Sequence, residues 1–278
     1  MTSRRPDVDL TLCWGTLRGV GLPTLLSAAH NAGFDHVTAS IVEHRSDLDR
    51  GLADVRDVIT STGVDVICVE PVIRPLPGLP HPGSIHEHLR SYLEYELEDV
   101  LDAAVGVGAT YVNIAHFLGR SVDIELISDV VNNIATHAQH RGLEATLEFI
   151  PGTGIPNLAA ALHVLDRCRS DNVRLMIDTY HLHTSGGVAS DIDRIPSGSI
   201  RAIQVSDTAV DLRRSGSEFS QRLMPGKGML PLAELIDAAR RNNPSVELHV
   251  EVFNEDLLKQ FTPAEVATAA RAALDVLA

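Results

Sequence analysis

The sequence predicts an α/β protein that folds as a single (β/α)8 TIM barrel domain over residues 1–278. Short aliphatic and β-branched runs, typical of buried parallel strands, alternate with longer stretches that have the spacing of amphipathic helices. Eight such strand–helix units fit into about 270 residues, which matches a parallel barrel in its length, in the order of its elements and in the shortness of its loops. No shift in composition marks a linker between domains.

The eight apolar runs follow one another in order along the chain. Strands are predicted over residues 8–14, 36–41, 64–69, 111–115, 143–148, 173–178, 200–204 and 246–251. Helices are predicted over residues 22–32, 46–62, 85–107, 123–141, 157–169, 230–241 and 262–277, with a weak short helix over 189–195.

Capping residues support these boundaries. A glycine stands just past the end of four predicted helices, where a left-handed residue closes the last turn: Gly33, Gly63, Gly108 and Gly142. Polar residues that cap helix N-termini stand at Ser46, Asp123 and Thr262, and Pro263 follows at the first helical position.

A doubly wound open sheet is the alternative fold. That fold calls for a glycine-rich phosphate turn after the first strand, with the pattern GxGxxG. The run Cys13-Trp-Gly-Thr-Leu-Arg-Gly19 does not fit the pattern well, so the barrel is favoured.

Charge and composition exclude several classes of partner. The net charge is −14, and an acidic chain without a basic stripe is a poor non-specific ligand for nucleic acid or anionic membranes. No apolar stretch approaches the roughly 20 residues of a membrane span, and the first residues lack the apolar segment of a signal peptide. We therefore expect a cytoplasmic protein. Three widely spaced cysteines are expected to be free thiols: Cys13, Cys68 and Cys168.

Two irregular stretches follow predicted strands. Residues 73–83 carry four prolines after the third strand, and residues 207–228 are rich in polar side chains after the seventh. Loops at the carboxyl ends of the strands form the active face of such a barrel. Each stretch is therefore a candidate lid over a site.

Polar residues with metal-binding oxygens end the last four strands. Side chains alternate between the barrel interior and the helix layer, and in each strand the last inward residue is a carboxylate or an amide: Glu148, Asp178, Gln204 and Glu251. Three converging buried carboxylates require a cation. An all-oxygen set predicts one divalent ion, Mn²⁺ or Mg²⁺ in the first place, with Co²⁺ and Zn²⁺ as the alternatives.

Other polar or aromatic residues stand at the ends of earlier strands. His116 follows the fourth strand, Glu70 ends the third and Trp14 ends the first, so each is a candidate for contact with a substrate. The competing interpretations are a polar rim residue for His116 and Glu70, and core packing for Trp14.

Several of these residues resemble a known family. Glu148, Asp178-Thr-Tyr-His181, Gln204-Val-Ser-Asp207, Arg222-Leu-Met-Pro-Gly-Lys-Gly228 and Glu251 are similar to motifs of the xylose isomerase-like barrel superfamily. The resemblance implies that Glu148, Asp178, Gln204 and Glu251 hold one divalent metal ion. It also implies that Glu148 and Glu251 exchange the substrate proton, and that His181 and Arg222 contact substrate oxygens. Sugar epimerases of this group usually carry His at the position of Gln204, whereas some dehydratases carry Gln.

These observations predict an enzyme of carbohydrate metabolism. The expected reaction is isomerisation or epimerisation of a small polyhydroxylated hydroxy-carbonyl compound, by α-proton abstraction and formation of an enediolate. The alternative is a metal-dependent dehydratase, a lyase of the 3-dehydroshikimate or inosose type. Abasic-site endonuclease activity is disfavoured by the net charge, and a non-catalytic sugar-binding module has little use for three converging carboxylates. A homodimer is common in such barrels.

Overall fold

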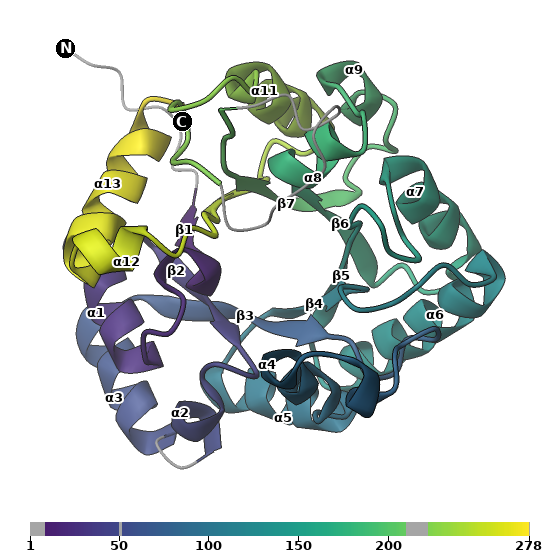
Figure 1. Cartoon of the computed structure of the whole chain (residues 1–278), viewed down its shortest axis with the longest axis horizontal. Helices are drawn as coiled ribbons and strands as arrows, with labels where there is room; N and C mark the ends of the chain where they lie inside the picture. Colours follow the sequence, from purple (N-terminus) through teal and green to yellow (C-terminus); the bar gives the residue numbers. More distant parts are fainter. Residues whose placement is uncertain (1–8, 50–51, 210–221, 278) are drawn as a thin grey trace.

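Eight parallel strands close into a barrel in the computed structural model, which describes residues 9–49, 52–209 and 222–277 (Figure 1). Each strand pairs with its neighbours in chain order, and β1 pairs with β8 to complete the circle. The predicted TIM barrel fold is thereby confirmed. The strands are β1 Leu10–Leu12, β2 His36–Ser40, β3 Asp65–Val72, β4 Tyr111–Ala115, β5 Glu144–Glu148, β6 Val173–Asp178, β7 Ile200–Val205 and β8 Glu247–Val250.

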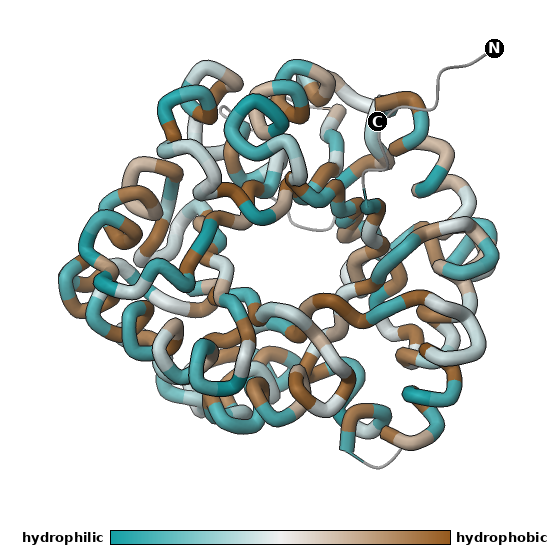
Figure 2. Tube along the Cα trace, turned by 180° about the vertical axis from the view of Figure 1, so that it is seen from behind, coloured by the Kyte–Doolittle hydropathy of each residue, from teal (hydrophilic) through white to brown (hydrophobic). Residues whose placement is uncertain are grey.

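Helices surround the strands as an outer ring, and they alternate between apolar and polar residues along their length (Figure 2). Within the described residues, no helix is long and apolar enough to cross a membrane. The α-helices are α1 Leu22–Ala32, α2 Arg45–Asp49, α3 Leu52–Thr62, α4 Glu87–Arg90, α5 Leu97–Val107, α6 Ile124–His140, α7 Leu158–Arg167, α8 Thr179–Thr184, α9 Ala189–Ile192, α11 Leu232–Asn242, α12 Leu257–Gln260 and α13 Pro263–Asp275. The 3₁₀ helices are η1 Trp14–Leu17, η2 Pro82–Ser84 and η3 Ser91–Leu93.

The long helix predicted over residues 85–107 is wrong as a single element. The chain forms α4 and η3, leaves the helical path, and starts again at α5. A capping box explains the restart, because the backbone N–H of Glu96 donates to the carboxylate of Asp99, which lies in the first turn of α5. Residues 94–99, which are rich in acidic side chains, therefore form a helix boundary rather than one face of a long helix.

Other predicted boundaries also differ. Ser46 lies inside the first turn of α2 rather than before it, since that helix begins at Arg45. The predicted helix over 46–62 appears as α2 and α3, on either side of residues 50–51, which lie outside the described residues. The first strand is shorter than predicted, because Trp14 turns away from the barrel wall in η1.

A side chain reinforces the closure between β1 and β8. The Thr16 hydroxyl donates to the carbonyl of Val250 at 3.0 Å and accepts from the backbone N–H of Val252 at 2.9 Å. The backbone N–H of Cys13 donates to the same carbonyl at 3.1 Å. Glu251 lies between these two bonded residues, so its backbone is held at the mouth of the barrel.

Candidate active site

Four predicted ligand residues lie at the carboxyl ends of adjacent strands. Glu148 ends β5 and Asp178 ends β6, where Asp178 stands opposite Gln204 of β7. Glu251 follows the last residue of β8. The four side chains are buried, with exposed fractions between 0% and 7%. The alternation rule therefore places all four inside the same end of the barrel.

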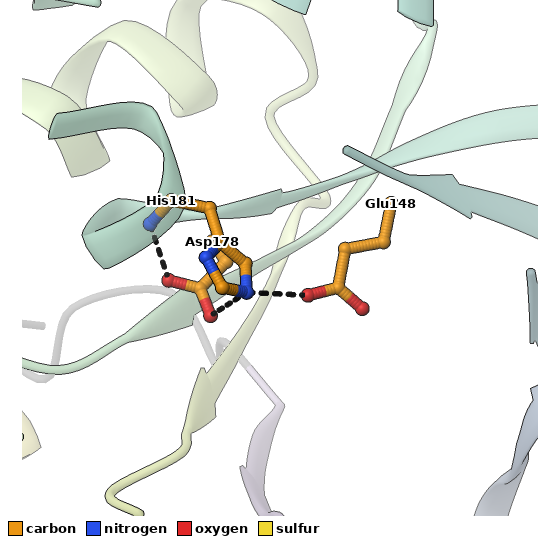
Figure 3. A group of neighbouring side chains, drawn as sticks. All are labelled: Glu148, Asp178 and His181. Atoms are coloured by element: carbon orange, nitrogen blue, oxygen red, sulfur yellow. Dashed lines mark hydrogen bonds and ion pairs between the residues drawn. The ribbon is translucent and has the colours of Figure 1, made fainter. Parts of the chain in front are cut away.

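His181 lies beside two of these carboxylates because α8 starts directly at Asp178. One oxygen of Asp178 caps the helix, since it accepts from the backbone N–H groups of Tyr180 at 2.7 Å and His181 at 3.2 Å. The His181 ring nitrogen Nε2 then lies 3.4 Å from Glu148 and 3.7 Å from Asp178 (Figure 3). Burial lowers the pKa of His181 to about 4, so the ring is neutral.

Arg222 lies among the carboxylates. Its Nη1 donates to Asp178 at 2.7 Å and to the Glu251 carboxylate at 3.2 Å, and its Nη2 lies 3.3 Å from the His181 ring. Its guanidinium stacks against the rings of Tyr180 and Phe253, with ring centroids 4.7 and 5.2 Å away. The resemblance implied contact with a substrate oxygen; in the structure the guanidinium lines the cavity and also pairs with two of the proposed metal ligands.

One guanidinium cannot keep all the carboxyl groups of this region ionised. Glu148, Asp178 and Glu251 are buried close to Arg222, and Glu70 is buried on the lining of the same cavity. Burial raises the pKa of Glu148 to about 8, and burial also raises that of Glu251 well above its usual range. Burial alone would raise the pKa of Asp178 too, but Arg222 and His181 hold it below its ordinary value. A cation is the natural complement to this excess of carboxylates.

The Gln204 amide points to the same conclusion. Neither its oxygen nor its nitrogen has a hydrogen-bond partner within the described residues, although the side chain is only 1% exposed. The Cys13 thiol lies next to this amide, but a thiol is only a weak hydrogen-bond donor. Buried amides are almost always paired, so an unpaired one calls for a ligand. The donor set thus fits a divalent metal ion.

Asn113 is a site residue that the sequence analysis missed. Its side-chain N–H₂ group donates to Glu148 at 2.8 Å and to Glu70 at 3.0 Å. The Thr146 hydroxyl donates to the side-chain oxygen Oδ1 of Asn113 at 2.9 Å, which fixes the orientation of the side-chain amide. The alternation on β4 was the available signal, since Tyr111, Asn113 and Ala115 share the inward face.

Asp207, which the motifs contain but to which no role was assigned, acts through Arg222. Its carboxylate accepts backbone N–H groups of the loop that follows Arg222, from Gly226 at 3.1 Å, Gly228 at 2.9 Å and Leu230 at 3.0 Å. The backbone of Leu223 also pairs with that of Asp207. Asp207 therefore anchors the segment that carries the buried guanidinium.

A cavity of about 240 Å³ opens above the carboxylates. Glu70 and Trp14, both predicted to contact a substrate, line it. The Trp14 and Phe253 rings meet edge to face at 5.5 Å. The cavity is lined by charged and polar side chains together with aromatic and aliphatic ones: Trp14, Arg18, Glu70, Pro71, His88, Leu89, Tyr92, Asn113, Ala115, Phe117, Glu148, Ile150, His181, Arg222, Glu251 and Phe253.

The structure places one of the two candidate lids away from the cavity and describes only part of the other. Residues 73–83 do not line the cavity, which is covered on that side by Leu89 and Tyr92 of α4 and η3. The proline-rich segment is instead fastened to the loop after β4, where the Arg120 N–H donates to the carbonyl of Gly78. Most of the second candidate, residues 210–221 of 207–228, lies outside the described residues.

His116 was predicted to contact a substrate, and the structure places it elsewhere. It does not line the cavity, and both ring nitrogens bond to the backbone: Nε2 at 2.8 Å from the Pro77 carbonyl, and Nδ1 accepting from the Gly154 N–H at 3.0 Å. Burial lowers its pKa, so the ring is neutral and fully paired. His116 thus ties together the loops after β3, β4 and β5.

This packing makes Gly119 sensitive to substitution. A Cβ at Gly119 would lie 1.7 Å from the His116 ring, so Gly119→Ala is expected to lower the free energy of unfolding by about 1–3 kcal/mol. Urea denaturation measures the change. Gly106→Ala in α5 is the control, since its Cβ would meet only the flexible Leu52 side chain at 3.4 Å. Equal stability of the two variants would contradict the role given to His116.

The fold and these motifs define the class of protein. The chain belongs to the xylose isomerase-like TIM barrel family, whose model matches residues 26–278, and the resemblance predicted from the motifs is confirmed. Among curated proteins, the chain is similar to inosose isomerase of Bacillus subtilis (strain 168), with 24% identity over 151 residues. That match covers 54% of this chain and spans about half the length of the relative, 54%.

Solved structures share the fold over nearly the whole chain. A crystal structure of the IolI protein with bound zinc superposes with a TM-score of 0.81 at 18% identity, covering 97% of this chain and 98% of that one. The probable 3-DHS dehydratase AsbF from Bacillus anthracis gives a TM-score of 0.74 at 10% identity, covering 96% and 98%. At such identities, the likeness extends to the fold alone.

Proposed function

We propose that this chain is a divalent-metal-dependent isomerase or epimerase. It acts on a small sugar, keto-polyol or related hydroxy-carbonyl compound by abstracting a proton next to the carbonyl group. The observation that carries the proposal is the convergence of Glu148 and Glu251, from β5 and from the end of β8, on one buried cavity. The similarity to inosose isomerases supports the reaction class.

Glu148, Asp178, Gln204 and Glu251 would hold the metal ion. The unpaired Gln204 amide and the excess of carboxylates over Arg222 support this assignment. Oxygen ligands favour Mn²⁺ or Mg²⁺, while the zinc in the IolI structure keeps Zn²⁺ as an alternative. When bound, such an ion supplies Lewis-acid polarisation of a carbonyl oxygen.

The chain's own residues would manage the proton. Glu148 and Glu251 both line the cavity, so one carboxylate can accept the α-proton and the other can return a proton. Asn113 fixes one Glu148 oxygen through its 2.8 Å hydrogen bond. Arg222 retains an unpaired Nε–H among the described residues, so it remains a candidate donor to a substrate oxygen, together with the neutral His181.

Solvent exchange tests this proposal. The protein, supplied with Mn²⁺, is incubated in deuterated water with a panel of ketoses and inososes, and the recovered compounds are analysed by mass spectrometry and NMR. Deuterium at the carbon next to the carbonyl, together with an isomeric product, is the expected result. A panel without exchange, at full metal occupancy, would refute the proposal.

The dehydratase alternative rests on one residue. Gln204 stands where the resemblance leads us to expect His in sugar epimerases and Gln in some dehydratases. Loss of a β-hydroxyl as water, after the same proton abstraction, would give a conjugated product. Incubation with 3-dehydroshikimate or an inosose therefore discriminates the two reactions, because only dehydration produces new ultraviolet absorbance.

Metal binding should release protons. The pKa of Glu148 is raised to about 8, so this carboxyl is protonated at neutral pH in the metal-free protein and must ionise to bind a cation. The apparent affinity is expected to rise roughly tenfold for each pH unit up to about pH 8 and then to level off with respect to this group. Calorimetry in buffers of different ionisation enthalpy measures the release, and Glu148→Gln should release fewer protons. A binding enthalpy independent of the buffer would contradict this expectation.

A further inference from the structure

A row of buried polar side chains lies deeper in the barrel than the carboxylates, and the proposed reaction uses none of them. His249, two residues before Glu251 on β8, is fully buried. Its Nε2 lies 3.3 Å from the Glu247 carboxylate and 3.3 Å from the Tyr111 hydroxyl. Its Nδ1 lies 3.7 Å from the Cys13 thiol, which is also fully buried. The row therefore connects the start of β8 to a thiol near Glu251.

The lower end of this row fixes which nitrogen of His249 carries the proton. Arg201 pairs with Glu247 at 2.8 Å. Burial alone would raise the pKa of Glu247, but its hydrogen bond to His249 and the charge of Arg201 hold that pKa below its ordinary value. Glu247 is therefore a carboxylate, which only accepts hydrogen bonds. A neutral His249 ring must place its proton on Nε2, and its Nδ1 is left as an acceptor.

The acceptor on His249 sets the direction of the Cys13 thiol. Burial, together with the nearby Glu251, raises the pKa of Cys13 well above its usual range, so the sulfur keeps its proton. The S–H group donates to Nδ1 at 3.7 Å, and the sulfur lone pairs remain for the other neighbours of the thiol. Those neighbours are the Thr38 hydroxyl and the Gln204 amide.

The sulfur lone pairs distinguish the two ends of the Gln204 amide. An acceptor attracts the N–H₂ end and repels the oxygen end. A thiol contact is too weak to satisfy a buried amide, but it is enough to favour one of its two orientations. With the N–H₂ group toward Cys13, the amide oxygen is left for a cation, since Gln204 stands opposite Asp178 in the pairing of β7 with β6.

We propose that Cys13 and His249 are positioning residues that hold the Gln204 amide with its oxygen available to a cation. Neither touches the metal ion or the substrate. Both act through the amide, as the outer hydrogen-bond partners of metal ligands commonly do. The inference rests on the proposed function, because it takes Gln204 as a ligand of the metal ion.

Calorimetric titration of the whole protein with Mn²⁺ tests this inference without substrate or turnover. The titration is run at about pH 8, where histidine side chains are normally neutral. Cys13→Ala is expected to weaken Mn²⁺ binding by about 10–100-fold, the usual effect of losing an outer partner of a ligand. Cys13→Ser keeps a donor and an acceptor in the same place, so its affinity should stay within about threefold of that of the unaltered protein.

Cys68→Ala is the matched control. Cys68 is equally buried, on β3, where it packs with Tyr111, Met176 and Ala202. The substitution removes the same atom as Cys13→Ala but should leave the Mn²⁺ affinity unchanged. Equal losses of affinity in Cys13→Ala and Cys68→Ala would reduce the role of Cys13 to packing and overturn the inference.

A double-mutant cycle isolates the step through the amide. In a Gln204→Ala background there is no amide to orient, so Cys13→Ala should cause no further loss of Mn²⁺ affinity. His249→Phe keeps a ring but removes the acceptor, so it should weaken binding only when Gln204 is present. The same loss with and without the amide would overturn the inference. If the unaltered protein binds no Mn²⁺, the proposed metal-dependent function fails first, and this inference fails with it.

Discussion

Replacing Glu148 or Glu251 by glutamine is expected to lower turnover by a factor of about 10²–10⁴, the usual contribution of a positioned acid or base. Glutamine keeps the size of the side chain and an oxygen ligand but cannot accept the α-proton. Steady-state rates and deuterium exchange, both measured at saturating Mn²⁺, give the effect. Saturating metal is needed because each glutamate is also a proposed ligand.

The two variants should retain deuterium exchange on opposite faces of the reacting carbon. A two-base epimerase that has lost one carboxylate can still exchange deuterium on one face of the carbon while it fails to form the epimer. Glu144→Gln is the matched control, since this glutamate begins the same strand and pairs with Arg174 outside the cavity. Full activity in both Glu148→Gln and Glu251→Gln would remove them from the mechanism.

Arg222→Met should destabilise the metal-free protein by about 3–5 kcal/mol, because it leaves Asp178, whose pKa this pairing holds low, buried without its counter-charge. Methionine retains an apolar stem between Tyr180 and Phe253. Added Mn²⁺ should restore most of the loss, since the cation supplies the missing charge. Chemical denaturation with EDTA and with Mn²⁺ measures both values.

Arg241→Met provides the comparison for this experiment. Arg241 pairs with Asp193 at the surface, and exposed pairs of this kind contribute about 0–1 kcal/mol. Mn²⁺ should change the free energy of unfolding of the Arg241→Met variant by the same amount as that of the unaltered protein. If Arg222→Met were equally unstable with and without Mn²⁺, the guanidinium and the cation would not serve the same carboxylates.

The sequence was sufficient for the fold and for the direction of the strand-end side chains. Both depend on short-range patterns: the alternation of strands and helices, and the two-residue period within a strand. The inward positions of Glu148, Asp178 and Gln204 follow from that period. The same rule applied to β4 would have identified Asn113.

Other features depend on contacts between distant segments. The position of Arg222 is set by Asp207 and by rings from two other elements, so no local pattern indicates that it pairs with Asp178. His116 directly follows a strand, as a substrate residue would, yet both its ring nitrogens bond to a carbonyl and an N–H group of neighbouring loops. The break before α5 depends on whether Glu96 caps a helix or continues one.

The bonds of Thr16 to Val250 and Val252 have a consequence for synthesis on the ribosome. Glu251 takes its place only when the earliest strand meets the last, so a nascent chain that lacks β8 carries its other carboxylates without a finished pocket. Activity should therefore emerge in one late step rather than accumulate as the polypeptide grows.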